Sequence, residues 1–154
     1  MEKTITTVII GADHRGYRMK EELKRTLSEW GYLIDDQGAH AHDPDDDYPD
    51  FGFAVGRAVH TIGHFGILLC GSGVGIAIAA NKVPGIRAAL CMSPDQAVAA
   101  RRDDNANVLV IASDFITAAV ARRIMKAFLE TEFYPKERYM RRLQKIEKAE
   151  KGRK

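Results

Sequence analysis

The chain has 154 residues, of which 45% are hydrophobic and 29% are charged, and its formal net charge is +2 at pH 7. These values are typical of one globular domain with a sizeable core, and no apolar run is long enough to span a bilayer. Cys70 and Cys91 are too few for a disulfide framework. We therefore expect a protein of the reducing cytoplasm that does not associate with membranes.

Short apolar runs typical of strands alternate with segments of helical periodicity along the chain. In chain order we predict a strand at 7–11, a helix at 15–30, a strand at 32–35, a polar loop at 37–49, a helix at 50–62, strand 65–69, a helix from 76, strand 86–91, a helix from 93, strand 107–111, and helices at 117–129 and 136–151. This alternation predicts a single-domain α/β fold, doubly wound and Rossmann-like, with a five-stranded parallel sheet, helices on both faces and a C-terminal helix.

The positive charge is concentrated at the C-terminal end. Residues 135–154 hold nine Lys or Arg against three Glu, so the rest of the chain carries fourteen cationic and eighteen anionic side chains. A basic tail can bind nucleic acid, but few aromatic residues accompany it and no nucleic-acid-binding motif occurs elsewhere. We therefore expect a solvated helix and no nucleic-acid partner, and we divide the chain into a core at 1–135 and a basic helix at 136–154.

The turn after the third predicted strand carries the most distinctive chemistry. Cys70-Gly71-Ser72-Gly73-Val74-Gly75 follows an apolar run and precedes a predicted helix. Its glycines let backbone N–H groups approach a ligand, and a helix N-terminus favours phosphate, an enolate oxygen or the thiolate of Cys70. Ligands bind at the carboxyl ends of parallel strands, which should bring Asp13 and His14 to the same edge.

Several motifs together resemble the ribose-5-phosphate isomerase B family, which includes the galactose-6-phosphate isomerase subunits. They are Gly11-Ala12-Asp13-His14-Arg15-Gly16, Asp47-Tyr48-Pro49-Asp50, the Cys70–Gly75 turn, Ala79-Ala80-Asn81-Lys82 and Gly85-Ile86-Arg87-Ala88. They stand in the family's order over nearly the whole chain. The resemblance implies interconversion of phosphorylated aldoses and ketoses without a metal or cofactor, by a homodimer or tetramer with active sites at the subunit interface.

The resemblance also implies a role for each matching residue. Cys70 would be the base that moves a proton between C1 and C2 through an enediolate, because the glutamate of other members would fall at Gly75. Ser72 would help to hold the enediolate oxygen. Asp13 would lie near O1 or O5 of the sugar, and His14 would contact the phosphate.

Further substrate contacts would come from the glycine turn and from the C-terminal helix. Backbone amides of Gly71, Gly73, Val74 and Gly75 are candidates for stabilising the enediolate. Arg138 and Arg142 are four residues apart, so they share a helix face, and in the family pattern they reach the phosphate from the neighbouring subunit.

Three positions depart from the family pattern. Asp103 and Asp104 stand where the family usually has histidine and asparagine, and Asp114 stands where it often has a phosphate-binding arginine. Asp103 is a candidate for opening the sugar ring, with a pKa raised by Asp104, and Asp104 is a candidate substrate contact. A tetrose 4-phosphate would need no ring opening.

The leading reaction is therefore the conversion of D-ribose 5-phosphate to D-ribulose 5-phosphate. The alternatives are a tetrose 4-phosphate, allose or galactose 6-phosphate as substrate, or a relative that binds sugar phosphates without turnover.

The loop at 37–49 also contains residue types that bind metals. His40 and His42 are followed by Asp43, Asp45, Asp46 and Asp47. Their loose spacing is more typical of a solvated loop than of a metal site. We expect no metal there.

Overall fold

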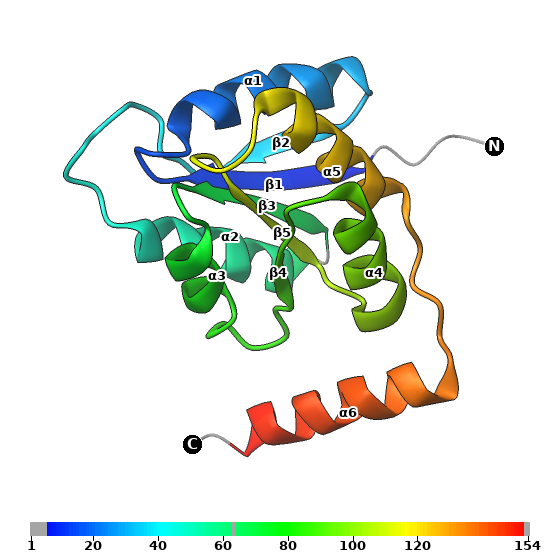
Figure 1. The fold of residues 1–154 in the computed structure, drawn as a ribbon. Coiled ribbons are helices and arrows are strands. Elements are labelled where there is room, and N and C mark those ends of the chain that lie inside the picture. The colour runs from blue at the N-terminus through cyan, green and yellow to red at the C-terminus, as the bar shows by residue number, and fades with distance from the viewer. Residues whose placement is uncertain (1–5, 63, 153–154) are drawn as a thin grey trace.

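The computed structural model describes residues 6–62 and 64–152, and its strands form one parallel sheet (Figure 1). The strands are β1 (Thr7–Ala12), β2 (Leu33–Asp36), β3 (Phe65–Cys70), β4 (Ala88–Leu90) and β5 (Val108–Ala112). Their order across the sheet is β2-β1-β3-β5-β4, and each neighbouring pair is parallel. The prediction of a five-stranded parallel sheet is confirmed.

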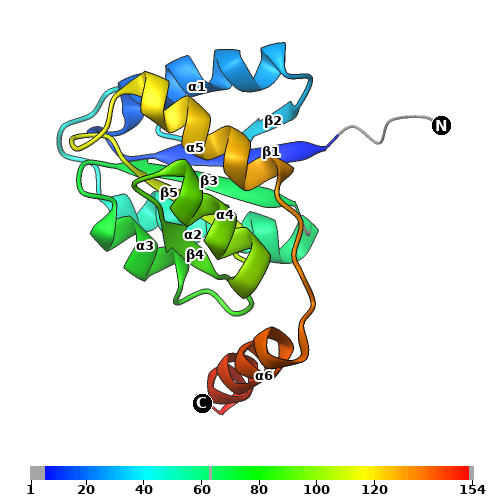
Figure 2. The ribbon, with the colours of Figure 1, turned by 45° about the vertical axis from the view of Figure 1, so that its right-hand side comes forward.

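Helices cover both faces of the sheet, as Figures 1 and 2 show. One face carries α1 (Tyr17–Glu29), α4 (Pro94–Asp104) and α5 (Ala118–Glu130), and the other carries α2 (Tyr48–Ile62) and α3 (Val74–Ala80). The chain ends in α6 (Glu137–Lys151). Within the described part of the chain, no helix combines the length and the apolar character that crossing a membrane requires.

Alternate strand residues build the two halves of the core. Val8 and Ile10 pack with Leu23 of α1 in one cluster, whereas Ile9 packs with Val55 of α2 in the other. All five side chains are fully buried. This pattern follows from the two-residue period of a strand, which sends successive side chains to opposite faces of a sheet covered on both sides.

Strand β4 is shorter than the predicted 86–91, and a side chain takes a backbone hydrogen bond just before its start. The Arg87 N–H donates to Oδ1 of Asn107 at 2.8 Å instead of joining the ladder. On the open edge, Asn81 Oδ1 accepts from the Ala88 N–H at 2.8 Å, and its Nδ2 donates to the Ala88 carbonyl at 3.0 Å. Asn81 therefore ties the edge strand to the end of α3.

Helix α6 stands apart from the sheet, below the layers in Figures 1 and 2. The segment that leads to it is attached to the end of α4, where the Tyr134 N–H donates to the Arg102 carbonyl at 3.0 Å. Among the helix's own residues, Tyr139 alone is buried. Near its far end, Glu150 accepts a hydrogen bond from the Gly85 N–H at 3.0 Å.

Candidate active site

Three turns meet at the carboxyl edge of the sheet, where the parallel strands β1, β3 and β5 end. The Ser113 N–H donates to the Cys70 carbonyl at 2.9 Å, and the Asp114 N–H donates to the Gly71 carbonyl at 3.0 Å. The Ser113 hydroxyl lies 3.0 Å from the carbonyl of Arg15 and 2.9 Å from that of Cys70. One serine therefore links all three turns, and the predicted meeting of the first and third strand ends is confirmed.

Cys70 and Asp13 form the buried centre of this edge. The thiol donates to Oδ2 of Asp13 over 3.0 Å, and both residues are almost inaccessible to solvent. Oδ1 of Asp13 accepts from the N–H groups of Arg15 at 3.0 Å and Gly16 at 3.1 Å. These backbone bonds fix the carboxylate, so its second oxygen faces the sulfur.

The pKa of Cys70 is raised to about 11, first by burial and then by the Asp13 carboxylate that accepts its hydrogen bond. The N–H groups of Gly73 and Gly71 face the sulfur and lower its pKa, but by less. The amides of the turn therefore favour the thiolate, as expected, but burial and the Asp13 carboxylate outweigh them in the ligand-free protein. Here Cys70 is a protonated thiol.

The glycine turn allows close approach at two points. Gly73 has φ of +74°, a left-handed conformation that favours glycine, and a Cβ there would lie 2.7 Å from Cδ1 of Leu90. A Cβ at Gly75 would lie 2.5 Å from the ring of Tyr48. Tyr48 at the start of α2 therefore covers the position where the resemblance would place a glutamate base in other members.

Ser72 lies within this turn and is partly exposed. Its hydroxyl accepts from the Val74 N–H at 3.3 Å. The hydroxyl and this amide are thus together within the turn that follows Cys70.

His14 is held by a carboxylate that the sequence did not single out. Its Nδ1 lies 2.6 Å from Oδ1 of Asp46, and its backbone N–H donates to the same oxygen at 3.1 Å. The hydrogen bond to Asp46 raises the pKa of His14, and the charge of Asp13 adds to the effect. The cationic form of His14 is therefore favoured, which suits an anionic substrate.

Asp13, His14 and Asp46 each offer a potential metal ligand, and these atoms lie within 4.8 Å of one another. In this arrangement Asp13 already accepts from two amides and the thiol, while Asp46 binds the imidazole. His40 and His42 are exposed. The prediction of a metal-free site stays a prediction.

The remaining predicted site residues lie at the opposite, amino edge of the sheet. Asp103 and Asp104 end α4, just before β5 begins at Val108, whereas Cys70 pairs with Ala112 at the far end of β5. The four intervening steps along the strand correspond to roughly 13 Å. One chain therefore does not bring Asp103 or Asp104 to Cys70.

Asp103 is bound by the guanidinium of Arg102, whose Nε and Nη2 lie 2.6 and 2.9 Å from its oxygens. This bidentate contact lowers the pKa of Asp103, and nearby Tyr139 and Arg138 lower it further. The expectation that Asp104 raises this pKa is therefore wrong. Asp103 is a carboxylate paired with a cation.

Arg138 lies in the first turn of α6 beside this cluster, and its Nη2 donates to the hydroxyl of Tyr139 at 3.1 Å. Arg142 follows one turn later and is exposed. Helix α6 lies below the edge strand β4 in Figure 2, across a groove from α3 and β4. The two arginines remain predicted contacts to a neighbouring subunit's substrate.

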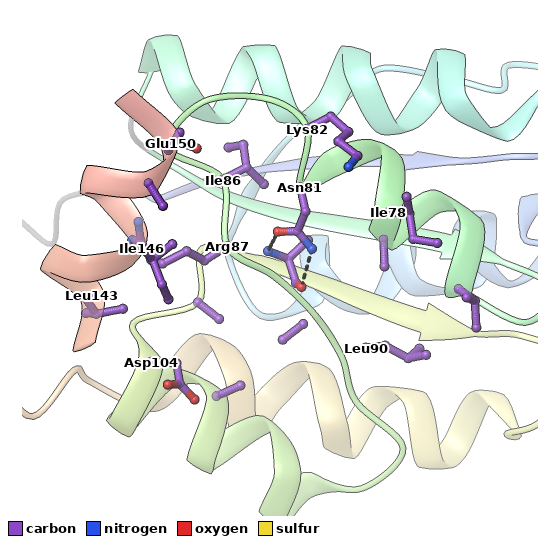
Figure 3. A pocket seen from close by; sticks show the side chains of 17 residues that line it. Ile78, Asn81, Lys82, Ile86, Arg87, Leu90, Asp104, Leu143, Ile146 and Glu150 are labelled. Carbon is purple, nitrogen blue, oxygen red and sulfur yellow. Dashed lines mark hydrogen bonds between the residues drawn. The ribbon is translucent and has the colours of Figure 1, made fainter. Parts of the chain in front are cut away.

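A groove of about 830 Å³ separates α6 from α3 and β4 (Figure 3). Ile78 of α3 faces it from one side, and Leu143 and Ile146 of α6 face it from the other. Ile78 and Ile146 are each 56% exposed. The groove is lined mainly by apolar side chains, so it suits a protein surface better than a sugar phosphate.

Comparisons with known proteins agree with this architecture. Residues 8–146 match the model of the family described as Ribose/Galactose Isomerase. Ribose-5-phosphate isomerase B of Mycobacterium tuberculosis is 43% identical over 137 residues, which are 88% of this chain and 85% of that protein.

Two solved structures are also similar. The type B enzyme of Clostridium thermocellum aligns with a TM-score of 0.91 and 39% identity over 95% of this chain and 98% of that one. The enzyme of Mycoplasma genitalium, solved with bound ribulose-5-phosphate, also gives a TM-score of 0.91 and 39% identity, over 96% of this chain and 97% of that one.

Proposed function

Because the chain belongs to the ribose/galactose isomerase family, we propose that it interconverts D-ribose 5-phosphate and D-ribulose 5-phosphate, with Cys70 as the base. The Mycoplasma genitalium relative was solved with ribulose-5-phosphate, and this supports the same sugar phosphate here. The observation that carries the proposal is the buried hydrogen bond of 3.0 Å between the Cys70 thiol and Asp13 under the glycine turn. With two free cysteines, the reducing cytoplasm is the proposed compartment.

The hydrogen bond offers a route by which the protonated thiol becomes a base. Its proton passes to Oδ2 of Asp13, and the thiolate then removes the proton from C2 of the open-chain aldose. Asp13 protonates O1 as the C1–C2 double bond forms, which gives the enediol. The Cys70 thiol next returns its proton to C1, while Asp13 takes the hydroxyl proton from O2 to leave the ketone.

The amides around Cys70 fit the charge that develops in this reaction. The N–H groups of Gly71 and Gly73 face the sulfur, so they stabilise the thiolate when it forms. The Val74 N–H and the Ser72 hydroxyl, which bind each other at 3.3 Å, are donors for the negative charge that develops on a sugar oxygen in the transition state. Donors that are already in place stabilise such a charge without reorganisation.

The proposed active unit is a homodimer or tetramer with sites between subunits. Asp103, Asp104, Arg138 and Arg142 lie away from Cys70 of their own chain, so they can serve a substrate only in another copy. The groove against α6 and the exposed Ile78 and Ile146 offer an apolar surface for that copy. In this proposal the helix at 136–154 contributes to the neighbouring subunit's site.

A tetrose 4-phosphate is the second candidate substrate, because of the state of Asp103. A carboxylate whose pKa is lowered by Arg102 is a poor proton donor to a ring oxygen. A tetrose whose O4 carries the phosphate cannot form the furanose ring and needs no such donor.

Substitution of Asp103 by His distinguishes the two substrates. We expect wild-type protein to turn over ribose 5-phosphate, and D103H to raise that rate by about tenfold at neutral pH, since imidazole is a better proton donor there. Erythrose 4-phosphate turnover should not respond. The matched control is D95H, in the exposed first turn of the same helix.

Absence of ribose 5-phosphate turnover by folded wild-type protein would reject the leading substrate. Turnover of the tetrose alone would establish the second candidate. An unchanged pentose rate in D103H would remove Asp103 from ring opening.

A further inference from the structure

Arg15 is anchored by its backbone on both sides at the edge that carries Cys70. Its N–H donates to Oδ1 of Asp13 at 3.0 Å, and its carbonyl accepts from the Ser113 hydroxyl at 3.0 Å. The backbone of Arg15 is therefore held between the ends of β1 and β5, and the side chain extends from there. It is 53% exposed, so solvent and small anions can reach it.

The guanidinium of Arg15 lies over the residue that follows the proposed base. A Cβ added at Gly71 would be 2.8 Å from Nη1 of Arg15 and closer still to Nε and Cζ. Gly71 therefore leaves room for this cation against the turn. The positive charge therefore stands over the glycine turn, at the same edge of the sheet as Cys70.

Asp114 holds the guanidinium in the ligand-free protein. Oδ2 of Asp114 accepts from Nη2 of Arg15, and the Asp114 N–H donates to the Gly71 carbonyl at 3.0 Å. The Asp114 side chain is 38% exposed. An ion pair between partly exposed groups is weak, so another anion can replace Asp114.

A phosphate dianion is a stronger partner for this guanidinium than a single carboxylate. Arg presents a planar fork of donors that binds phosphate oxygens in pairs, and the dianion carries more charge. The neighbouring His14, whose Nδ1 lies 2.6 Å from Oδ1 of Asp46, is in the same turn, and this contact favours its cationic form. The turn after β5 contributes the anionic side chain of Asp114, and this negative charge does not attract phosphate.

We infer that Arg15 binds the phosphate of the substrate and that Asp114 is the carboxylate which this phosphate displaces. The inference rests on the proposed function for the identity of the ligand as a sugar phosphate. It makes Asp114 a competing anion that sets the affinity of the site. It also explains why an aspartate stands at this position of an anion-binding edge.

The test compares R15A, R15K and D114N with R18A, a matched control at an exposed arginine in the first turn of α1. We expect R15A to raise KM for ribose 5-phosphate by about tenfold or more and to change kcat by less than about threefold. R15K should fall between R15A and wild type, because it keeps the charge and loses the fork. D114N should lower KM by about two- to fivefold, and R18A should match wild type.

Calorimetric binding of inorganic phosphate to the same proteins gives a readout that needs no turnover. Weaker phosphate binding by R15A and tighter binding by D114N support the inference even if wild-type protein does not isomerise ribose 5-phosphate. Unchanged phosphate affinity and KM in both R15A and R15K would overturn it. So would a higher KM in D114N, which would make Asp114 a support for Arg15 and not its competitor.

Discussion

Two opposing influences act on the pKa of the Cys70 thiol. Burial and the Asp13 carboxylate raise the pKa to about 11, while the amides of Gly73 and Gly71 act in the other direction. The ligand-free protein therefore stores the proton on sulfur, and the hydrogen bond to Asp13 gives that proton a place to go. Asp13 is in this way both the second cause of the raised pKa, after burial, and the proposed acceptor of the proton.

A titration of the Cys70 thiol tests this at the residue scale. Cys91 is fully buried and its pKa is also raised to about 11 by burial, so the experiment uses a C91A background. We expect the ultraviolet absorbance of the thiolate to appear with a midpoint near pH 11. Adding D13N should lower that midpoint, since a neutral amide no longer disfavours the anion. A midpoint below pH 9 in C91A would contradict the raised pKa of the Cys70 thiol.

The connection between α1 and the loop after β2 depends on a buried lysine. Lys20 is fully buried, and its Nζ lies 2.8 Å from Oδ1 of Asp36 and 2.5 Å from the Ala39 carbonyl. Lys24 adds a contact of 2.7 Å to Oδ2 of Asp36. This network holds the start of the loop that later supplies Asp46 to His14.

Replacement of Asp36 by Asn should therefore destabilise the fold. Burial raises the pKa of Asp36, but hydrogen bonds from Lys20 and Lys24 outweigh it and the pKa lies below its usual 3.8. A lowered folded-state pKa stabilises the protein above pH 3.8, and this contribution is lost as the pH falls through the folded-state value. At pH 7 we expect D36N to cost about 3 kcal/mol, because Lys20 stays buried without its anion.

Thermal unfolding of D36N and wild type at several pH values measures this effect. The melting temperature of D36N should fall by about 10 °C at pH 7, and the difference should shrink below pH 3.8. The exposed Asp45 of the same loop provides a control as D45N. Equal stability of D36N and wild type at pH 7 would show that the network is not stabilising.

The periodicity of apolar residues predicted the strands, and the parallel topology predicted that two site residues would lie at the same edge of the sheet. Apolar runs predicted all five strands, and the rule for strand ends predicted that Asp13 and Cys70 would meet. Strand β4 was overestimated at its start, where the Arg87 N–H binds the side chain of Asn107, a contact that leaves no periodic signal. The spacing of residues along a strand shows nothing about such partners.

The ion pairs at the site could not be predicted from the sequence, because their partners lie far apart along the chain. His14 and Asp46 are 32 residues apart, and Arg15 and Asp114 are 99 residues apart. Their contacts depend on the paths of irregular loops, which neither a helical nor a strand period describes. Tyr48 belongs to one of the motifs that resemble the family. Its position over Gly75 could not be predicted from that motif, because it depends on how α2 packs against the turn.

At the scale of the whole molecule, the candidate site residues fall into two groups at opposite edges of the sheet. Asp13 and Cys70 lie at the carboxyl edge, and Asp103 and Arg138 lie near the amino edge. Groups this far apart cannot contact one small sugar phosphate. A second copy that presents its α6 would complete each site.

Subunit complementation tests that arrangement. C70A and the double variant R138A/R142A should each be strongly impaired as pure oligomers. Mixed dimers should contain one site with both halves intact, so an equal mixture after subunit exchange recovers about a quarter of wild-type activity. The control mixture of C70A with D13A, which damages the same half twice, should recover nothing. Equal recovery in both mixtures would contradict a shared site.

The most direct test of the central claim is ribulose 5-phosphate formation from ribose 5-phosphate in D₂O by wild type, C70A and C91A. We predict that wild type and C91A form the ketose with deuterium at C1, because the proton that Cys70 removes can exchange with solvent before it returns. C70A should lose about a thousandfold or more in kcat, since it removes the proposed base for C2. Turnover by folded C70A at the wild-type rate would contradict the assignment of Cys70 as the base.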